Sequence, residues 1–540
     1  MLLLRIYFKE KLLRSITTPL LIILTSIFIV LFDNVSFFKH VLETYPFTMK
    51  NVGFLLSLGI ILYALIVILL TTVSSRYTLK PVIIISLILA SLIAYFMQSY
   101  NIVIDKTMIE NTLQTDIHES MDLLSIKLII YLILLGILPS WLVYKIPLQH
   151  RVFKTELWSK IKLILSHLIL IVLLLFSFSK FYTSFFREHK DLRLYTNPVT
   201  AVYNLVSYTY DQVKDTNIPM KKIGQDAKQL KDTTQADRKR KIVIMVVGEA
   251  ARSDHFSLNG YTKETNPLLK KEDIINFSQM YSCGTTTAVS VPCMFSMYGR
   301  DDYDSTKGNN TYNVLDVLSH AGIEVLWRDN NSDSKGVALR VPYENYKTPH
   351  LNTVCQSECR DVGMIKGLEN VIAKSNKDIL IVLHQMGNHG PAYFKRYPDA
   401  FKKFTPTCET NQLETCTTEE INNAYDNALL YTDYFLTQVV DFLKKYDEKA
   451  QTAMIYIADH GESLGENGLY LHGLPYFIAP EHQKHVGAFM WFGKNFPVDK
   501  EKLKTKSDHK YSQDNLFSTL LGLFNVQTKV YKKEMDILRQ

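Results

Sequence analysis

The chain has 540 residues, more than one ordinary domain uses, and 47% of them are hydrophobic. Long apolar runs are confined to about residues 17–178, whereas the remainder has the composition of a soluble globular protein, so a wholly soluble chain is excluded. The net charge of +7 does not require a nucleic-acid partner to explain it, because much of the basic excess lies beside the apolar runs, where basic residues set membrane topology.

Five apolar runs are long enough, or nearly so, to cross a bilayer as helices, which takes about 20 residues. They lie at residues 16–33, 52–73, 81–98, 126–144 and 162–179. Basic residues concentrate in the N-terminal tail and in the second and fourth loops, so we expect a cytoplasmic N-terminus and an external C-terminal part. A buried core helix or a cleaved signal peptide is the alternative for the first run, but four further runs follow it and no small-residue cleavage site does.

Residues 180–240 connect the apolar part to the soluble part. Aromatic residues at the start of this connector, Phe181, Tyr182, Phe185 and Phe186, favour the headgroup zone of a membrane, and its end is polar. We therefore predict a transmembrane domain at 1–179, a bridging helix with a linker at 180–240, and an α/β domain at 241–540.

Short β-branched runs alternate with amphipathic stretches after residue 240, which is the pattern of an α/β sheet. The predicted strands lie at 241–247, 323–327, 378–384 and 452–458. Polar residues follow each strand: Glu249, Arg328 to Asn331, Gln385 to Gly390, and Asp459 to Glu462. Open α/β sheets bind ligands beyond the carboxyl ends of their strands, so we expect these four clusters to converge on one site.

The residues at two of these strand ends indicate a metal centre. Glu249, Asp459 and His460 supply two carboxylates and an imidazole, a donor set that suits zinc with a fourth position left open for catalysis. Each residue alone would more often be a helix cap or a solvated loop residue. An acidic residue and an Asp-His pair at separate strand ends favour the metal.

The run CGTTTAVSVPC, from Cys283 to Cys293, precedes an apolar stretch that we predict to be helical. A threonine at that helix N-terminus would have backbone N–H groups aimed at an incoming phosphate, and a zinc ion could activate its hydroxyl as a nucleophile. The alternative is an ordinary N-cap. Residue chemistry alone does not choose among Thr285, Thr286 and Thr287.

All six cysteines lie in the part predicted to be outside the cytoplasm, where disulfides form. They fall into three close pairs, and nearest-neighbour pairing predicts Cys283–Cys293, Cys355–Cys359 and Cys408–Cys416. The alternative is a zinc cluster, but the one C-x₃-C motif has no matching pair nearby.

Several motifs in order resemble the lipid A phosphoethanolamine transferases, a family of the alkaline phosphatase and sulfatase superfamily that includes the mobile colistin-resistance enzymes. The motifs are VVGEAARSDHFSLNGY, CGTTTAVSVPC, RDNNSDSKG, HQMGNHGPAYFKRYP and ADHGESLGENGLYLHG. The resemblance covers essentially the whole chain. It implies an N-terminal five-helix transmembrane domain and a periplasmic catalytic α/β domain, with a mixed sheet flanked by helices, in the inner membrane of a Gram-negative bacterium.

The resemblance also implies roles for matching residues. Thr287 would be the catalytic nucleophile, held by the Cys283–Cys293 disulfide. The implied zinc ligands are Glu249, Thr287, Asp459 and His460. The implied contacts to the phosphoethanolamine are Lys335, His389 and His472, and the alternative for the two histidines is a second zinc ion.

The implied reaction transfers phosphoethanolamine from phosphatidylethanolamine to lipid A, or to another lipopolysaccharide or lipooligosaccharide acceptor, through a covalent threonine intermediate. Modified lipid A would carry less negative charge, which predicts resistance to polymyxins and cationic peptides. We expect zinc as the cofactor, membrane lipids as partners, no nucleic acid and a monomer. The alternatives are a lipoteichoic-acid-type polyglycerolphosphate synthase, a phosphodiesterase of the same superfamily, and a non-catalytic membrane scaffold or transporter.

Overall fold

The structure is a computed structural model that describes residues 15–115, 117–149, 152–215, 218–230, 239–356 and 358–539. The basic residues Arg5, Lys9, Lys11, Arg14 and Arg151, which contribute to the predicted topology, lie outside the described residues.

The chain forms two compact units. The first consists of Met1–Ile109 and Leu124–Tyr208, and the second of Glu110–Leu123 and Thr209–Gln540. The loop segment Glu110–Leu123 lies between two apolar runs in the sequence but belongs to the second unit, which the sequence did not anticipate. The predicted domain boundaries at 179 and 240 stay predictions.

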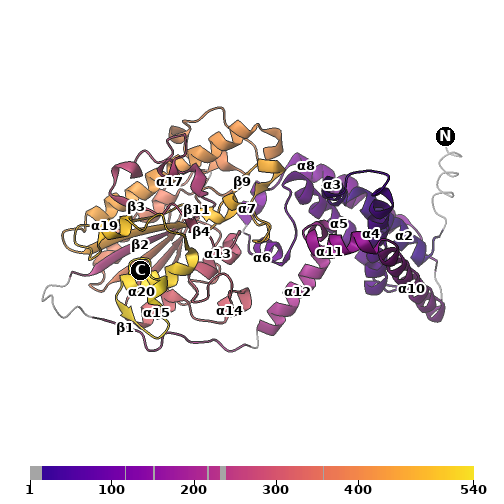
Figure 1. The fold of residues 1–540 in the computed structure, drawn as a ribbon, viewed down its shortest axis with the longest axis horizontal. Helices are drawn as coiled ribbons and strands as arrows, with labels where there is room; N and C mark the ends of the chain where they lie inside the picture. Colours follow the sequence, from indigo (N-terminus) through magenta and orange to yellow (C-terminus); the bar gives the residue numbers. More distant parts are fainter. Residues whose placement is uncertain are drawn as a thin grey trace. The chain divides into compact units, whose positions relative to one another are not determined.

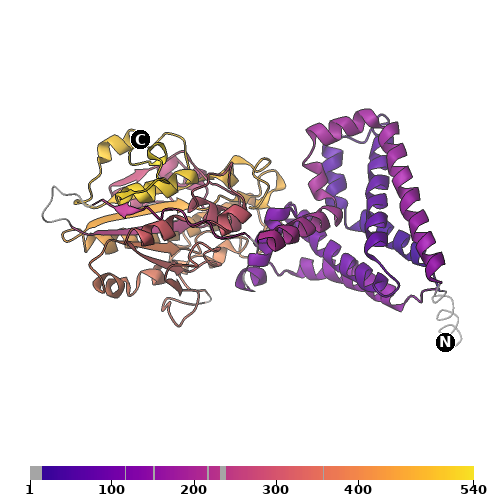
Figure 2. The same ribbon diagram turned by 90° about the horizontal axis from the view of Figure 1, so that it is seen from below.

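Among the described residues of the first unit, four helical runs are long and apolar enough to cross a membrane: α4 (Val52–Val73), α5 (Leu79–Ser99), Ile126–Lys145 and α10 (Phe153–Ser177). Helix α4 packs along α10, and α5 packs along the Ile126–Lys145 run (Figure 2). Four of the five predicted spans thus have helices in the expected places.

The first predicted span is a bent pair of helices. Helix α2 (Thr18–Phe32) has 15 residues, about 22 Å at 1.5 Å per residue, which is shorter than a bilayer core of about 30 Å. Helix α3 (Val35–Thr44) follows at an angle of 56°, so the described residues contain five spans only if this pair crosses as one. The break falls at Asp33 and Asn34, where the Asn34 side chain donates to the carbonyl of Ile29 at 3.0 Å.

The run Ile126–Lys145 contains a π-helical segment, η1 (Leu132–Ile137), between α8 (Ile126–Tyr131) and α9 (Leu138–Lys145). Pro139, within the first turn of α9, lacks the backbone N–H that would continue regular α-helical bonding.

Helices α11 (Ser179–Glu188) and α12 (Val199–Asp215) form the start of the predicted connector. Tyr182 and Phe185 of α11 are buried against Phe54 of α4, so they serve the core of the first unit rather than its surface. Phe186 is exposed, as expected for a ring at the headgroup zone.

The second unit is built on a seven-stranded mixed sheet with the order β3-β12-β8-β2-β7-β5-β6. The strands are β2 (Lys241–Gly248), β3 (Ile274–Asn276), β5 (Glu324–Asp329), β6 (Tyr343–Asn345), β7 (Ile379–His384), β8 (Gln451–Ala458) and β12 (Ala488–Phe492). Strand β12 is antiparallel to both of its neighbours, β3 and β8, and the other neighbouring pairs in this sheet are parallel. The four strands predicted from the sequence are β2, β5, β7 and β8, and they form the parallel centre of the sheet.

Helices cover both faces of this sheet. In Figure 1, α17 (Thr418–Lys444) lies over one face, and α15 (Val314–His320) and α20 (Leu516–Leu523) lie over the other. Every residue of β2 and β8 is buried, as expected for parallel strands covered on both faces. The predicted mixed sheet flanked by helices is confirmed.

The remaining elements are short. The helices are α6 (Lys106–Gln114), α7 (Ile117–Asp122), α13 (Thr287–Met294), α14 (Ser305–Asn309), α16 (Leu368–Ala373), α18 (Glu481–Lys484) and α19 (Lys500–Lys504). The strands are β1 (Lys228–Gln229), β4 (Met280–Tyr281), β9 (Ser463–Leu464), β10 (Tyr470–Leu471), β11 (His485–Val486), β13 (Tyr511–Ser512) and β14 (Val526–Gln527).

Helix α17 begins with a capping box, which predicts a measurable contribution to stability. The Glu420 backbone N–H donates to the Thr417 hydroxyl, and the Thr417 N–H donates to the Glu420 carboxylate at 2.7 Å. Thr417→Ala should lower the free energy of unfolding by about 1 kcal/mol because it removes the hydroxyl that accepts from the Glu420 N–H. Thermal unfolding of the purified protein in detergent measures the change. Thr418→Ala, one residue into the helix, is the matched control, and an equal shift in both variants would contradict the role of the cap.

Candidate active site

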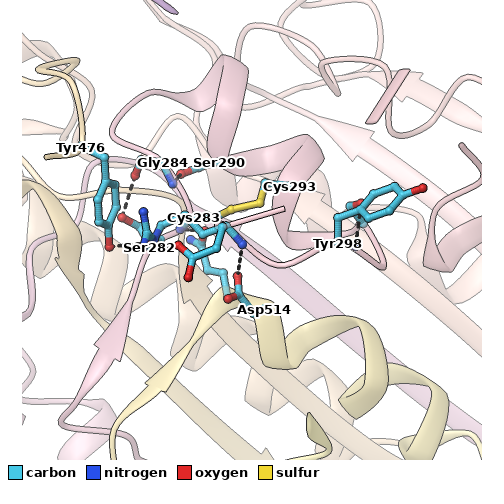
Figure 3. Close-up of a disulfide and its surroundings, with 12 residues drawn as sticks. Ser282, Cys283, Gly284, Ser290, Cys293, Tyr298, Tyr476 and Asp514 are labelled. Atoms are coloured by element: carbon cyan, nitrogen blue, oxygen red, sulfur yellow. Dashed lines mark hydrogen bonds and ion pairs between the residues drawn. A yellow bond between two sulfur atoms is a disulfide. The ribbon is translucent and has the colours of Figure 1, made fainter. Parts of the chain in front are cut away.

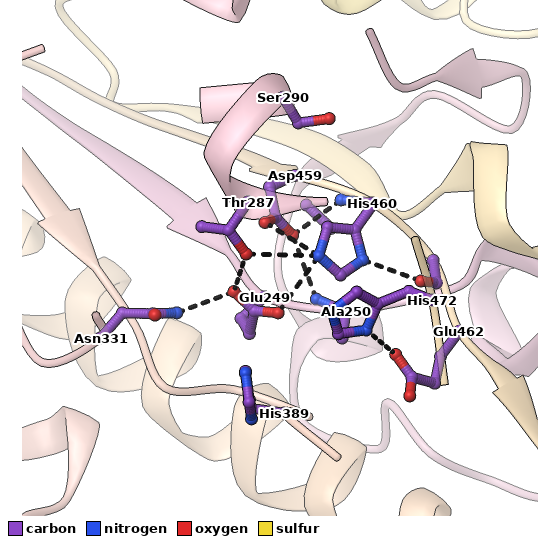
Figure 4. A network of polar contacts seen from close by, with 12 residues as sticks. Glu249, Ala250, Thr287, Ser290, Asn331, His389, Asp459, His460, Glu462 and His472 are labelled. Carbon is purple, nitrogen blue, oxygen red and sulfur yellow. Dashed lines mark hydrogen bonds and ion pairs between the residues drawn. The ribbon is translucent and has the colours of Figure 1, made fainter. Parts of the chain in front are cut away.

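Glu249, Asp459 and His460 meet at the carboxyl ends of two neighbouring strands. Gly248 at the end of β2 pairs in register with Ala458 at the end of β8, so the residues that follow lie side by side. All three side chains are fully buried, and one donor atom from each lies within 4.8 Å of the others (Figure 4). The structure therefore brings these three residues together, as the sequence predicts.

Hydrogen bonds orient the donor atoms of this cluster. The N–H groups of Ala250 and His460 donate to Asp459 Oδ1 at 3.1 and 2.7 Å. His460 Nδ1 lies 2.9 Å from the carbonyl of Gly461, which assigns the ring proton to Nδ1 and a lone pair to Nε2. Burial lowers the pKa of His460 and so favours this neutral form.

The residues of the cluster fit a divalent metal ion. His460 Nε2 faces Glu249 Oε1 at 3.4 Å and Asp459 Oδ2 at 3.3 Å, so three electron-pair donors point toward one another. Asp459 Oδ2 is buried and accepts no hydrogen bond from the described residues. Buried donors in this arrangement require a cation between them, and oxygen with imidazole nitrogen is a donor set that zinc accepts.

The structure distinguishes among the three threonines at the start of α13. Thr285 Oγ1 donates to the carbonyl of Leu474 at 2.7 Å. Thr286 occupies the N-cap position but makes no side-chain cap bond. Thr287, the first residue of the helix, places Oγ1 at 3.1 Å from Glu249 Oε2 and 3.3 Å from His460 Nε2. The predicted helix is present, and only Thr287 of the three contacts the cluster of acidic and histidine side chains.

A disulfide encloses the loop that carries Thr287 (Figure 3). Cys283 is bonded to Cys293, as nearest-neighbour pairing predicts, and the other two predicted pairs are also present. Inside the loop, the Gly284 N–H donates to Ser290 Oγ at 2.8 Å. Tyr476 donates from outside the loop to the carbonyl of Ser282 at 3.1 Å. The covalent bond and these contacts restrain the backbone on both sides of Thr287.

Gln513 links this loop to the carboxyl end of β8. The sequence analysis did not identify Gln513. Its side-chain oxygen accepts from the Cys283 N–H at 2.7 Å. Its amide group donates to the carbonyls of Ala458 and Asp459 at 2.8 and 2.7 Å. The buried amide of Gln513 therefore sets the spacing between the disulfide-enclosed loop that carries Thr287 and the end of β8.

Asn331 is a second site residue that the sequence analysis did not assign. Its side-chain amide donates to Glu249 Oε2 and to the carbonyl of Gln385, both at 2.8 Å. Asp329 Oδ1 in turn accepts from the Asn331 N–H at 2.9 Å. The sequence did contain a signal for Asn331, because this residue follows the end of a central strand and the carboxyl edge of the sheet forms the site.

The other residues of the predicted strand-end cluster on β5 do not join the site. Arg328 donates to Glu344 at 2.7 Å and to two backbone carbonyls. Asp329 Oδ2 accepts from Trp327 and contacts His384 Nδ1 at 2.9 Å. Both side chains satisfy buried groups around the strand, so this part of the predicted convergence is wrong.

Two of the predicted substrate-binding residues border the cluster. The His472 ring lies 4.1 Å from the His460 ring between centroids, and the His389 ring lies 6.0 Å from that of His472. Burial lowers the pKa of His389, and the nearby Arg396 charge lowers it further. Lys335, the third of these residues, lies in the loop after Asn331 and donates to the carbonyls of Gln114 and Ser332 at 3.0 and 3.2 Å.

Glu462 orients His472, which the sequence analysis did not foresee. Glu462 Oε2 lies 2.8 Å from His472 Nδ1, and Oε1 accepts from the Tyr393 hydroxyl at 2.7 Å. Donor atoms of Glu462, His460 and His472 form a second group within 4.8 Å. This group shares His460 with the first and contains His472 but not His389, so the alternative of a second zinc ion stays a prediction.

Two residues beside the site hold left-handed backbone conformations. Ala250, directly after Glu249, has φ of 51°, and Leu471, directly before His472, has φ of 63°. Such conformations are unfavourable for residues other than glycine, and persist where surrounding contacts impose them. Ala250 is held by the Tyr425 hydroxyl of α17, which donates to its carbonyl at 2.7 Å.

Two protein-family models match this chain and identify the class of its second unit. The Sulfatase family model matches residues 241–526, and the model described as Phosphoethanolamine transferase EptA/EptB matches residues 62–213. The mixed sheet, the acidic and histidine cluster at its carboxyl edge and the first of these matches define an enzyme domain of the alkaline phosphatase and sulfatase superfamily.

Full-length relatives narrow the class. Phosphatidylethanolamine transferase Mcr-1 from Escherichia coli is 43% identical, with 97% of this chain and 98% of the relative covered. Phosphoethanolamine transferase EptA from Escherichia coli K12 is 40% identical, with 96% of each covered. The structure of the integral membrane lipooligosaccharide phosphoethanolamine transferase A from Neisseria meningitidis matches with a TM-score of 0.93 at 35% identity, covering 97% of this chain and 99% of that one.

The chain belongs to the phosphoethanolamine transferase family. It is an inner-membrane enzyme with apolar helices in its N-terminal region and a periplasmic catalytic domain. The predicted enzyme class and location are confirmed.

The disulfide around Thr287 leads to a prediction. Replacing Cys283 and Cys293 by serine should lower transfer activity about tenfold to a hundredfold, because small displacements of a reacting group have effects of that size. Activity per folded protein, with folding measured by thermal unfolding, tests this. The control replaces Cys408 and Cys416, whose disulfide closes a loop of similar length elsewhere. Equal activity losses in the two double variants would contradict a specific role for Cys283–Cys293.

Proposed function

We propose that this enzyme transfers phosphoethanolamine from phosphatidylethanolamine to lipid A, with Thr287 as the covalent nucleophile. The observation that carries the proposal is the position of Thr287 Oγ1 beside Glu249 and His460 at the N-terminus of α13. The names of the relatives support the donor, and the Neisseria structure, described as a lipooligosaccharide transferase, supports a glycolipid acceptor. We expect the active chain to be a monomer.

In the first step, Thr287 Oγ attacks the phosphorus of phosphatidylethanolamine. Glu249 Oε2, which accepts the hydroxyl hydrogen bond at 3.1 Å, receives the Thr287 proton. A bond forms between Thr287 Oγ and phosphorus, and the bond from phosphorus to the diacylglycerol oxygen breaks. Diacylglycerol leaves with the proton that Glu249 received, and phosphoethanolamine remains on the threonine.

In the second step, an oxygen of a lipid A phosphate attacks the same phosphorus from the side that diacylglycerol has left. The bond to Thr287 Oγ breaks, and the threonine oxygen regains the proton that the attacking phosphate hydroxyl gives up through Glu249. His389, His472 and Lys335 bind the phosphoryl oxygens in both steps, and the α13 N-terminus contributes backbone N–H groups.

Glu249, Asp459, His460 and Thr287 would hold zinc at this site. A bound zinc ion lowers the pKa of a coordinated hydroxyl and offsets the negative charge that develops during phosphoryl transfer. Asn331 supports this arrangement because its amide fixes the orientation of the Glu249 carboxylate. Addition of the ethanolamine group lowers the negative charge of lipid A, so expression confers resistance to polymyxins and cationic peptides.

The nucleophile is tested by mass spectrometry of lipid A from a Gram-negative host that expresses the protein. Wild type should add phosphoethanolamine, and Thr287→Ala should lower transfer by about a thousandfold or more, because the covalent step requires the hydroxyl. Thr287→Ser keeps a hydroxyl and should retain part of the activity. Undiminished addition in Thr287→Ala would overturn the role of Thr287, and resistance to polymyxin should follow the same order.

The metal is tested without reference to activity. Elemental analysis of purified protein should find about one tightly bound zinc ion per chain, and Glu249→Gln and Asp459→Asn should each lower this content, because each removes a charged ligand. Asp441→Asn, at an exposed position of α17, is the control with the same change of chemistry. Zinc content that is equal in all four proteins would contradict the proposed ligands.

A further inference from the structure

Arg396 is a buried arginine that bonds on three sides to separate parts of the second unit. Its side chain is 2% exposed. Nε donates to the carbonyl of His389 at 2.7 Å, one Nη donates to Asp122 Oδ2 at 2.6 Å, and the other donates to Glu358 Oε1. One rigid guanidinium therefore joins the backbone of a predicted substrate-binding residue to two carboxylates.

The two carboxylates come from segments that are distant in the sequence. Asp122 ends α7, in the segment Glu110–Leu123 that joins two apolar runs, and Glu358 lies between the disulfide-bonded Cys355 and Cys359. Burial alone would lower the pKa of Arg396, but the charges of Glu358 and Asp122 raise it, so the guanidinium stays charged. A buried charge is stable only when it is paired, so removal of either carboxylate weakens the hold on Arg396.

The backbone that carries His389 is held at several points. The Asn388 N–H donates to the carbonyl of Glu249 at 3.1 Å, and the Gly387 N–H donates to Asp361 at 3.1 Å. Arg396 adds the bond at the carbonyl of His389 itself. Because the backbone sets the direction of the Cα–Cβ bond, this hydrogen bond restrains the position from which the His389 imidazole extends.

We propose that Arg396 is a positioning residue for His389, and that Asp122 and Glu358 act on the reaction through Arg396. The inference rests on the proposed function, in which the His389 imidazole binds the phosphoryl group. Arg396 does not contact the substrate in this scheme. Its guanidinium places His389 beside His472, and the segment Glu110–Leu123 thereby contributes to the geometry of the site.

A double-mutant cycle with the purified full-length chain tests the inference. Asp122→Asn and Glu358→Gln preserve shape and remove charge, and each should lower kcat/KM for phosphoethanolamine transfer to lipid A in mixed micelles about tenfold. In a His389→Ala background the same changes should have less than about a twofold effect, because residues that act through one group are not additive. A general loss of stability would lower activity equally in both backgrounds.

Glu344→Gln is the matched control. Glu344 also pairs with a buried arginine, Arg328, which bonds the carbonyls of Met364 and Lys366 rather than that of a site residue. This variant should keep the wild-type kcat/KM. Histidine-labelled protein provides a readout independent of turnover: the imidazole NMR signal of His389, assigned with His389→Gln, should shift in Asp122→Asn and Glu358→Gln but not in Glu344→Gln.

The outcomes separate this inference from the proposed function. If wild type transfers phosphoethanolamine but the two variants leave the His389 signal unchanged, or lower activity equally with and without His389, the positioning role of Arg396 is refuted. If the signal shifts while His389→Ala retains wild-type activity, the role of His389 in the proposed function is refuted instead. Wild type without any transfer would refute the proposed function itself.

Discussion

The site depends on electron-pair donors of Glu249, Asp459 and His460 held against one another in a buried position. This arrangement exists because β2 and β8 pair in parallel register, with Gly248 opposite Ala458 at their ends. These buried donors repel one another unless a cation lies among them. A metal ion bound between them would remove that repulsion. The Thr287 hydroxyl lies against this cluster, because it contacts both Glu249 and His460.

The surrounding residues act mainly on orientation. Gln513 sets the distance from the nucleophile loop to the end of β8, Asn331 turns the Glu249 carboxylate, and Glu462 fixes the His472 ring. Each has a buried polar side chain whose bonds go to a site residue or its backbone. Such contacts are expected around a phosphoryl-transfer site, where catalysis comes from positioning and charge rather than from complex covalent chemistry.

The segment Glu110–Leu123 lies between two apolar runs in the sequence but packs as part of the second unit. Asp122 binds Arg396 and Lys395, and the Gln114 carbonyl accepts from Lys335. Two of the three predicted substrate contacts, Lys335 and His389, are thereby bonded to this segment directly or through one arginine. The segment is therefore part of the second unit, although its position in the sequence suggests a simple connection between two apolar runs.

The sequence by itself determined the apolar helices, the four central strands and the candidate metal site of Glu249, Asp459 and His460, because hydrophobic periodicity and polar residues directly after strands are local signals. It paired the cysteines by proximity along the chain, and motif resemblance singled out Thr287. Tertiary structure alone decided the break between α2 and α3, the exclusion of Arg328 from the site, and the roles of Asn331, Gln513 and Arg396. The physical reason is that these roles consist of hydrogen bonds between residues far apart in the chain, whose partners no local pattern specifies.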